Sequence, residues 1–252
     1  LGGSIGTNGV LLAEIIEITN WNQLEEYGKE KIKGKVVFYN RPMNPTYVST
    51  FMAYGSCVDQ RHQGAYRAAK FGAVGVLVRS MTLKLDKNPH TGSMSYRDAE
   101  NKIPAAAIST KDAHDLSEAL KKGTFKEISM QLFCQQLKDT ISHNVIGELK
   151  GSKYPDEIIL VGGHLDSWDI GEGAHDDGAG VVQSLQVLES FKKLNIKPNR
   201  TIRCVMYMNE ENGNRGGKHY AKMVRQKGEK HLFALESDRG GFSPRGFSID
   251  GT

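Results

Sequence analysis

Six side chains in the second half of the sequence have the residue types that bind divalent metal ions, and each lies where a short apolar run begins or ends. They are His164, Asp166, Asp176, Glu210, Glu211 and Asp238. Imidazole nitrogen and carboxylate oxygen form a donor set that suits zinc or a similar ion. If the fold brings these residues together, the sequence predicts a metal site with a further acidic group for proton transfer.

His164 and Asp166 follow the apolar run 158–163 and are two positions apart. Positions i and i+2 of an extended chain share a face. A carboxylate commonly holds the second ring N–H of a metal-bound histidine, so Asp166 is a candidate to orient His164. A polar pair at the start of a loop is an equally common explanation of this motif when it is taken alone.

A glycine-rich acidic loop, residues 171–180, contains Asp176 and Asp177 and leads into an apolar helix. Asp177 is a candidate helix cap, because aspartate is favoured at helix N-termini. Asp176 has no such structural use, and one carboxylate can bridge two cations roughly 3.5–4 Å apart. Capping therefore explains Asp177 but is not sufficient for both residues, and Asp176 is a candidate ligand.

Two adjacent carboxylates, Glu210 and Glu211, follow the apolar run 201–209. Their mutual repulsion is relieved if one binds a metal ion while the other holds a water molecule. A solvated acidic loop is the alternative explanation. Asp238 ends a further apolar run, and Glu236, two residues earlier, competes with it for the role of ligand.

The second half alternates strand and helix patterns, which indicates an α/β fold with a largely parallel sheet flanked by helices. The expected strands are 144–148, 157–162, 201–209 and 231–236, and the expected helices are 178–194 and 216–225. In such sheets ligands gather at the carboxyl ends of the strands. Three strands would thus deliver the candidate residues to one edge, and this convergence is more specific than any single motif.

The first half has short β-rich runs around a few helical segments. The expected strands are 36–39, 75–78 and 128–133, and the expected helices are 60–71 and 109–123. This pattern predicts a compact β-rich domain with one or two helices. Its histidines, His62, His90 and His114, are isolated from one another, and we expect them at the surface or in packing roles.

The composition, with 38% hydrophobic and 25% charged residues, is that of an ordinary soluble globular protein. No stretch approaches the roughly 18 apolar residues of a membrane span. The 33 Lys and Arg and the 29 Asp and Glu are scattered without interleaved aromatic residues, which argues against nucleic-acid binding. Three dispersed cysteines indicate neither a disulfide framework nor a Cys-x-x-Cys metal site.

The order and spacing of the motifs resemble one known family, the co-catalytic zinc aminopeptidases and glutamate carboxypeptidases. The matching segments are Gly163-His-Leu-Asp-Ser-Trp168, Asp176-Asp-Gly178, Asn209-Glu-Glu211 and Glu236-Ser-Asp238. Within the family the chain looks most like the plasma glutamate carboxypeptidase group, which carries a protease-associated domain ahead of these motifs. Residues 64–78 are similar to that domain, and a generic βα unit is the alternative.

The resemblance implies two zinc ions with Asp176 as the bridging ligand. His164 and Asp238 would complete the coordination of one ion, and Glu211 would bind the other. The family has a further ligand, a histidine downstream of the position of Asp238, whereas this sequence has no histidine after His231. Because the first residue is not methionine either, we expect a truncated chain whose catalytic domain is incomplete at the C-terminus.

The resemblance also implies an activity, that of a zinc-dependent exopeptidase acting on terminal peptide bonds of small peptides or dipeptides. Glu210 would be the general base, Asp166 would orient His164, and the Asp176–Asp177 peptide would be cis. Trp168 either lines the substrate pocket or packs. Two alternatives stay open, a catalytically impaired peptidase-like binding or receptor module and a non-peptidase amide hydrolase.

The expected domains are residues 1–12 as part of the catalytic domain or a linker, 13–138 as the protease-associated domain, and 139–252 as the catalytic domain. The resemblance implies a secreted, extracellular, periplasmic or lysosome-like location, with which the sequon Asn199-Arg-Thr201 is compatible. It also implies a homodimer, for which no feature of the sequence provides a test.

Overall fold

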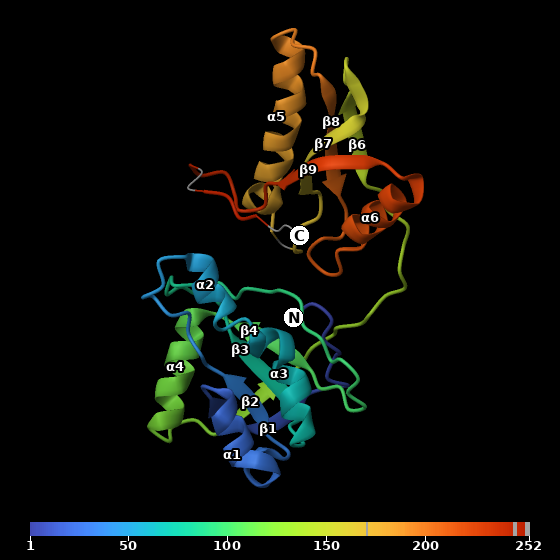
Figure 1. Cartoon of the computed structure of the whole chain (residues 1–252). Helices are drawn as coiled ribbons and strands as arrows, with labels where there is room; N and C mark the ends of the chain where they lie inside the picture. The colour runs from blue at the N-terminus through green and yellow to red at the C-terminus, as the bar shows by residue number, and fades with distance from the viewer. Residues whose placement is uncertain (170, 244–245, 250–252) are drawn as a thin grey trace. The chain divides into compact units, whose positions relative to one another are not determined.

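The computed structural model describes residues 1–169, 171–243 and 246–249. The chain divides into two compact units, Leu1–Asp139 and Thr140–Thr252 (Figure 1). The first residues, expected in the catalytic domain or a linker, instead pack within unit 1. The Leu1 amino group donates to the Ala105 carbonyl at 3.2 Å, and the Thr7 amide donates to the Leu132 carbonyl at 3.0 Å.

Unit 1 is built around a five-stranded sheet of order β4-β3-β2-β1-β5. Strands β1 to β4 run parallel, whereas β5 is antiparallel to β1. The strands are β1 (Leu11–Ile18), β2 (Val36–Tyr39), β3 (Gly75–Arg79), β4 (Ala105–Ile108) and β5 (Glu127–Met130). The helices are α1 (Trp21–Ile32), α2 (Thr50–Gly55), α3 (Asp59–Lys70) and α4 (Thr110–Lys121).

The alternation of side chains along the buried strands gives unit 1 two cores, one on each face of its sheet. Val37 and Tyr39 of β2 pack with apolar residues of α1 and α3. Val36 and Phe38, which point the other way, pack with Ala113 of α4 and its neighbours. The unit is therefore a three-layer arrangement with helices on both faces of the sheet.

The prediction of one or two helices in this half was wrong, because the fully described unit contains four. Helix α1 has only two buried residues, Leu24 and Ile32, and Gly28 interrupts it with φ +53°. Such a helix shows little apolar periodicity. Strand β4 reads Ala-Ala-Ala-Ile and lacks the β-branched residues that mark strands, so it was missed as well.

Unit 2 contains a four-stranded sheet of order β6-β8-β7-β9. Strands β8, β7 and β9 are parallel, and β6 is antiparallel to β8. The strands are β6 (Val145–Leu149), β7 (Tyr154–His164), β8 (Arg200–Tyr207) and β9 (Lys230–Glu236). The helices are a single π-helical turn, η1 (Ala174–Gly178), which continues into α5 (Ala179–Lys193), and α6 (Arg215–Lys227).

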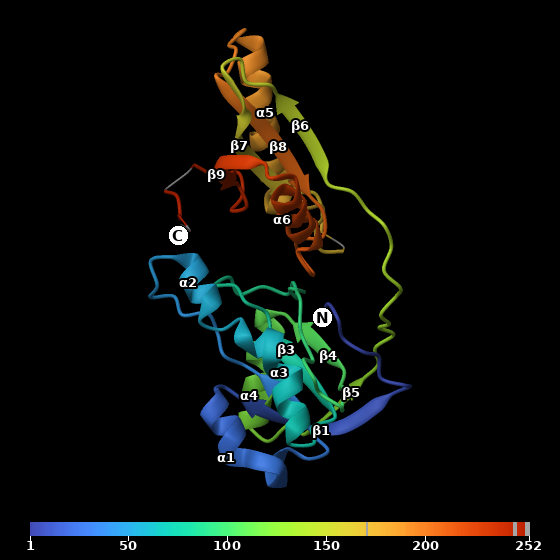
Figure 2. The same ribbon diagram turned by 45° about the vertical axis from the view of Figure 1, so that its right-hand side comes forward.

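Helices α5 and α6 cover opposite faces of this sheet (Figure 2). Val161 and Cys204 pack with apolar residues of α5, whereas Leu160 and Val205 pack with Tyr220 of α6. The mostly parallel α/β sheet expected for this half is confirmed. Among the residues that the structure describes, no helix is long and apolar enough to cross a membrane.

The strand order brings the carboxyl ends of three strands together. Strand β7 lies between β8 and β9, and the register pairs His164 with Tyr207 and Gly162 with Glu236. The loops that follow β7, β8 and β9 therefore begin at the same edge of the sheet.

Candidate metal centre

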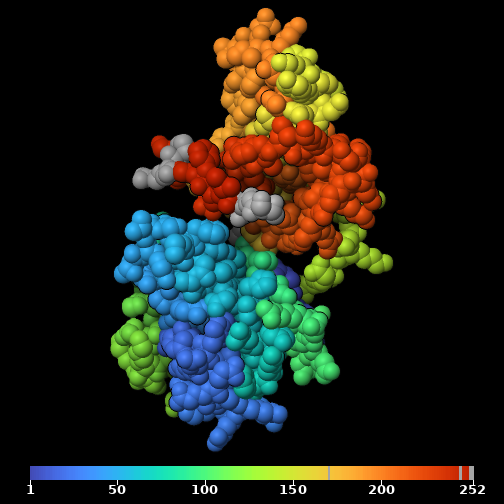
Figure 3. All heavy atoms as spheres, in the orientation of Figure 1, coloured from blue at the N-terminus to red at the C-terminus, as the bar shows by residue number. Residues whose placement is uncertain are grey.

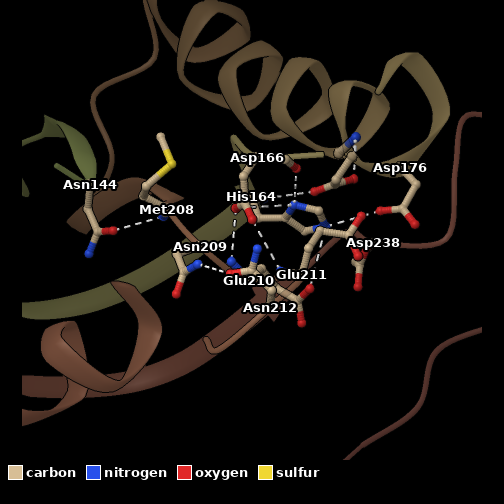
Figure 4. Close-up of polar contacts among 12 residues, drawn as sticks. Asn144, His164, Asp166, Asp176, Met208, Asn209, Glu210, Glu211, Asn212 and Asp238 are labelled. Atoms are coloured by element: carbon tan, nitrogen blue, oxygen red, sulfur yellow. Dashed lines mark hydrogen bonds and ion pairs between the residues drawn. The ribbon is translucent and has the colours of Figure 1, made fainter. Parts of the chain in front are cut away.

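The six candidate residues meet at this edge (Figure 4). His164 ends β7 with its side chain 1% exposed. Its Nε2 atom lies 3.1 Å from Oδ1 of Asp176 and 3.3 Å from Oδ1 of Asp238. The Glu210 carboxylate is 4.0 Å from the same nitrogen. One imidazole nitrogen thus faces carboxylates that arrive from three different loops.

This crowding of carboxylates changes the proton affinity of His164. Burial by itself lowers the pKa of the imidazole. The hydrogen bond to the Asp166 carbonyl and the negative charges of Asp238, Asp177 and Glu210 act in the opposite direction, and the pKa rises to about 9. The surrounding carboxylates therefore favour the protonated, positively charged form of this imidazole.

The pKa values of two acids at the centre are shifted as well. Burial, with the nearby charge of Asp176, raises the pKa of Glu211 to about 7. Burial is also the main cause that raises the pKa of Asp238 to about 6, with Asp176 and Asp177 contributing. Perturbed carboxyl groups that converge on one imidazole are typical of functional sites.

Asp177 has a structural role that its position in the sequence suggested. Its Oδ1 accepts a hydrogen bond from the Gly180 amide at 3.0 Å, and its Oδ2 accepts one from the His164 amide at 2.9 Å. The residue is 1% exposed. It thus caps the start of α5 and fastens that helix to the end of β7. The Asp176–Asp177 peptide is cis, as the resemblance implied.

Asp166 acts through different atoms than we expected. His164 Nδ1 lies 2.8 Å from the backbone carbonyl of Asp166 but 3.8 Å from its carboxylate. The carboxylate instead accepts hydrogen bonds from the amides of Glu210 at 2.9 Å and Glu211 at 3.2 Å. The carbonyl therefore orients the imidazole, and the carboxylate fixes the two glutamates that follow β8.

Two groups of ligand atoms have the spacing needed to hold an ion, with all atoms of each group within 4.8 Å of one another. The first contains His164, Asp176 and Glu211, and the second contains His164, Asp177 and Asp238. Both oxygens of Asp177 are occupied by backbone amides, so Asp176 is the better third ligand beside Asp238. Among the described residues, neither group includes Glu236.

Asn144 supports the site although it carried no recognisable signal in the sequence. The Asn144 side chain accepts from the Met208 amide at 3.0 Å and donates to the Gly216 carbonyl at 2.9 Å, which holds the end of β8. Trp168, part of the motif that begins at Gly163, lies near Glu211, and its indole N–H acts against the rise in the pKa of that carboxylate.

The convergence of His164 with several carboxylates agrees with the family that the sequence of unit 2 matches. Residues 144–251 match Peptidase family M28. The second half of the chain is an M28 domain. Over the whole chain the sequence is 37% identical to carboxypeptidase Q of Mus musculus and 38% identical to that of Homo sapiens. The chain spans about half the length of these relatives, 52% of each.

Solved structures confirm both the family resemblance and the α/β fold. The crystal structure of a Peptidase M28 precursor from Shewanella amazonensis SB2B is 41% identical, with a TM-score of 0.88 over 95% of this chain and 54% of that one. A zinc aminopeptidase from Bacillus subtilis shares the fold with a TM-score of 0.61 at 21% identity, covering 94% of this chain and 52% of that one.

Proposed function

We propose that the chain is part of a zinc-dependent exopeptidase that hydrolyses terminal peptide bonds of small peptides or dipeptides. The observation that carries the proposal is the convergence of Asp176 and Asp238 on the Nε2 atom of His164. Two relatives bear the names of exopeptidases, carboxypeptidase Q of Mus musculus and "Probable leucine aminopeptidase 2" of Aspergillus fumigatus, and they support the same reaction class.

The donor set fits zinc, which takes one imidazole nitrogen and carboxylate oxygens in many catalytic sites. His164, Asp176 and Asp238 would hold one ion, and Asp176 and Glu211 would hold a second. Zinc, when bound, polarises the scissile carbonyl and lowers the pKa of a water molecule.

Glu210 is the general base of this proposal. Its side chain is 34% exposed and lies beside the ligands without entering either ligand group, so its carboxylate is open to a substrate water. It would accept a proton from the attacking water and return it to the amine that leaves. Asp166 holds the backbone of Glu210 in place from the opposite loop.

For unit 1 we propose the role of a protease-associated domain, supported by the similarity of residues 64–78 and by their helix, turn and strand order. The location in a secreted or lysosome-like compartment and the assembly into a homodimer are proposals from the family resemblance alone. Carboxypeptidase, aminopeptidase and dipeptidase specificity are all compatible with the donor set.

The test uses the full-length protein that contains this chain, loaded with zinc, with bound metal measured by elemental analysis and hydrolysis measured on a panel of dipeptides. Glu210→Gln keeps the shape of the side chain and removes the base. We expect it to bind the same amount of zinc and to hydrolyse dipeptides about 10²–10⁴-fold more slowly. Glu189→Gln, on the exposed face of α5, is the matched control and is expected to behave like the unsubstituted chain.

Three outcomes would contradict the proposal. Equal turnover by the unsubstituted protein and Glu210→Gln would show that Glu210 is not the general base. Failure of the chain to bind zinc would remove the metal centre. Zinc binding by the full-length protein without hydrolysis of any dipeptide would favour the alternative of a peptidase-like binding module.

A further inference from the structure

We propose that unit 1 contains an oxyanion-binding site formed by Arg41, Arg61 and Arg79. The site is independent of the metal centre and of the proposed peptidase activity. All three arginines lie near Cys57, a fully buried residue: burial raises the pKa of its thiol, and the charge of each guanidinium acts against that rise. The Nε–H group of each arginine is buried and lacks a hydrogen-bond partner within the described part of the chain.

Arg41 is the only one of the three whose described contacts include a carboxylate. One of its terminal nitrogens forms an ion pair with Asp59, and its guanidinium lies 5.7 Å from the ring centre of Trp21. The Asp59 carboxylate also accepts the indole N–H of Trp21 at 2.6 Å. The single acid of the cluster is thus shared between two donors.

Arg61 is held by neutral groups. It donates to the Thr91 carbonyl at 3.1 Å and to the Tyr54 hydroxyl at 2.6 Å. Gly92, with φ +146°, lies against the guanidinium so closely that a Cβ atom there would overlap it. The backbone therefore leaves room for this arginine without supplying a counter-charge.

Arg79 is the last residue of β3 and donates to the side-chain oxygen of Asn40 at 3.2 Å. Asn40 in turn donates to Glu17 at 2.5 Å, so the nearest acid on this side is separated from Arg79 by an amide. Three guanidinium groups and one directly paired carboxylate leave a local excess of positive charge. Burial lowers the pKa of Arg41 and of Arg79, as expected for charged groups that are partly removed from water.

The location in the fold fits a ligand site. Arg79 ends β3 and Arg41 lies two residues beyond the end of β2, at the carboxyl edge of the parallel strands where α/β sheets bind ligands. Arg61 comes from the first turn of α3 beside them. The adjoining segment around α2, drawn in light blue, forms part of the visible surface of unit 1 (Figure 3).

A small oxyanion supplies what the cluster lacks. A buried N–H without a partner is costly, and a carboxylate or phosphate oxygen forms charge-assisted hydrogen bonds with arginine. Several guanidinium groups around one anion match the geometry that arginine offers to carboxylate and phosphate. The shared chemistry of the ligand is therefore a compact group with two or more anionic oxygens.

The experiment records the arginine Nε–H resonances of the whole chain by ¹⁵N NMR during titration with sodium phosphate and, separately, sodium acetate. Chloride is exchanged for each anion at constant ionic strength, so that screening does not change. We expect saturable shifts of the Arg41, Arg61 and Arg79 resonances, assigned with single substitutions. The Arg67 resonance is expected to stay fixed, because its Nε already donates to Gln63 at 3.2 Å.

The variants Arg79→Gln and Arg67→Gln form a matched pair. We expect Arg79→Gln to weaken anion binding about tenfold or more, and Arg67→Gln to leave it unchanged. If circular dichroism shows that Arg79→Gln is unfolded, Arg61→Gln replaces it. Saturation by phosphate alone or by acetate alone identifies the source of the oxyanion. The absence of saturable shifts with both anions, or equal affinity in the folded variant, would overturn the site.

Discussion

The Asp166 carboxylate accepts a hydrogen bond of 2.9 Å from the backbone amide of Glu210. Its second oxygen accepts one of 3.2 Å from the amide of Glu211. One side chain in the loop after β7 thus determines where both glutamates of the loop after β8 lie. Because Glu211 is a candidate ligand and Glu210 the candidate base, the two proposed roles depend on a single carboxylate.

Asp166→Asn tests this dependence. An asparagine side chain retains one acceptor oxygen but turns an NH₂ group toward one of the two amides, so one hydrogen bond is replaced by a donor facing a donor. We expect zinc affinity or dipeptide turnover to fall about 10–100-fold, as for other residues that support metal ligands. Zinc titration and activity measurements check this. Asp156→Asn, an exposed substitution at the start of β7, is the control, and equal effects of the two would contradict the role of Asp166.

The pKa shifts predict how the stability of the metal-free protein depends on pH. Folding raises the pKa of His164 from 6.5 to about 9. Its protonation therefore stabilises the folded state fully below pH 6.5, and this stabilisation is lost as the pH rises toward 9. The raised pKa values of Glu211 and Asp238, about 7 and 6, mean that folding also disfavours their charged forms as pH rises. All three groups have the same sign, and we expect metal-free unit 2 to become less stable from about pH 4 to about pH 9.

Zinc should reverse this trend, because its ligands must lose their protons to bind. Thermal unfolding with chelator and with saturating zinc, at about pH 5, 7 and 9, measures both effects. The increase in Tm caused by zinc is expected to grow with pH over this range. A Tm of the chelated protein that rises with pH would show that these three groups do not control its stability.

Gly180→Ala should damage the centre without touching a ligand. Gly180 lies in the first turn of α5, and a Cβ atom there would overlap the Ser237 carbonyl and both carboxylate oxygens of Asp177. Ser237 immediately precedes Asp238, so the displaced backbone would move a candidate ligand. We expect zinc affinity to fall at least about tenfold and the chain to lose about 1–3 kcal/mol of stability through overpacking.

The control for this prediction is Gly147→Ala in β6. A Cβ atom at Gly147 would meet only a methyl group of Leu188, at an ordinary contact distance of 3.7 Å. Zinc titration combined with chemical denaturation compares the two variants. Unchanged zinc affinity in Gly180→Ala would mean that the backbone near Asp238 accommodates the extra carbon.

The sequence predicted the positions of the candidate ligands better than the contacts that hold them. His164, Glu210 and Asp238 follow near-continuous apolar strands, and the parallel α/β pattern by itself requires their loops to share an edge. The hydrogen bonds that the Asp166 carboxylate accepts from two backbone amides could not be predicted in this way. They depend on the backbone direction of a loop 44 residues away in sequence.

The same limit applies to unit 1, where local patterns were weaker. Helix α4 was expected from its serine cap, and Ser109 indeed accepts from the Asp112 amide at 2.9 Å. Helix α2 has one buried residue, Ala53, and therefore offers no apolar periodicity to read. The arginine cluster could not be predicted from the sequence either, because Arg41, Arg61 and Arg79 come from three separate parts of unit 1.

Arg203→Met tests a buried ion cluster of unit 2 that lies apart from the metal centre. Arg203 is 9% exposed and donates to Glu148 and Glu229 at 2.5 Å each and to the Tyr220 hydroxyl at 2.8 Å. Methionine fills much of the volume but leaves two carboxylates without their cation, and removal of one partner from a buried ion pair typically costs about 3–5 kcal/mol. We expect the free energy of unfolding of unit 2 to fall by about 3 kcal/mol, the lower end of this range, because Glu148 and Glu229 retain some contact with solvent.

Arg200→Met is the matched control on the same strand. The Arg200 side chain is 39% exposed and pairs with Glu157, which keeps Lys230 as a second partner at 2.7 Å. A partly exposed pair of this kind contributes about 1 kcal/mol or less. Hydrogen exchange of the amides in β7 and β8 measures the stability of unit 2 separately from unit 1. Equal losses in the two variants would show that the contacts of Arg203 contribute no more than an ordinary surface ion pair.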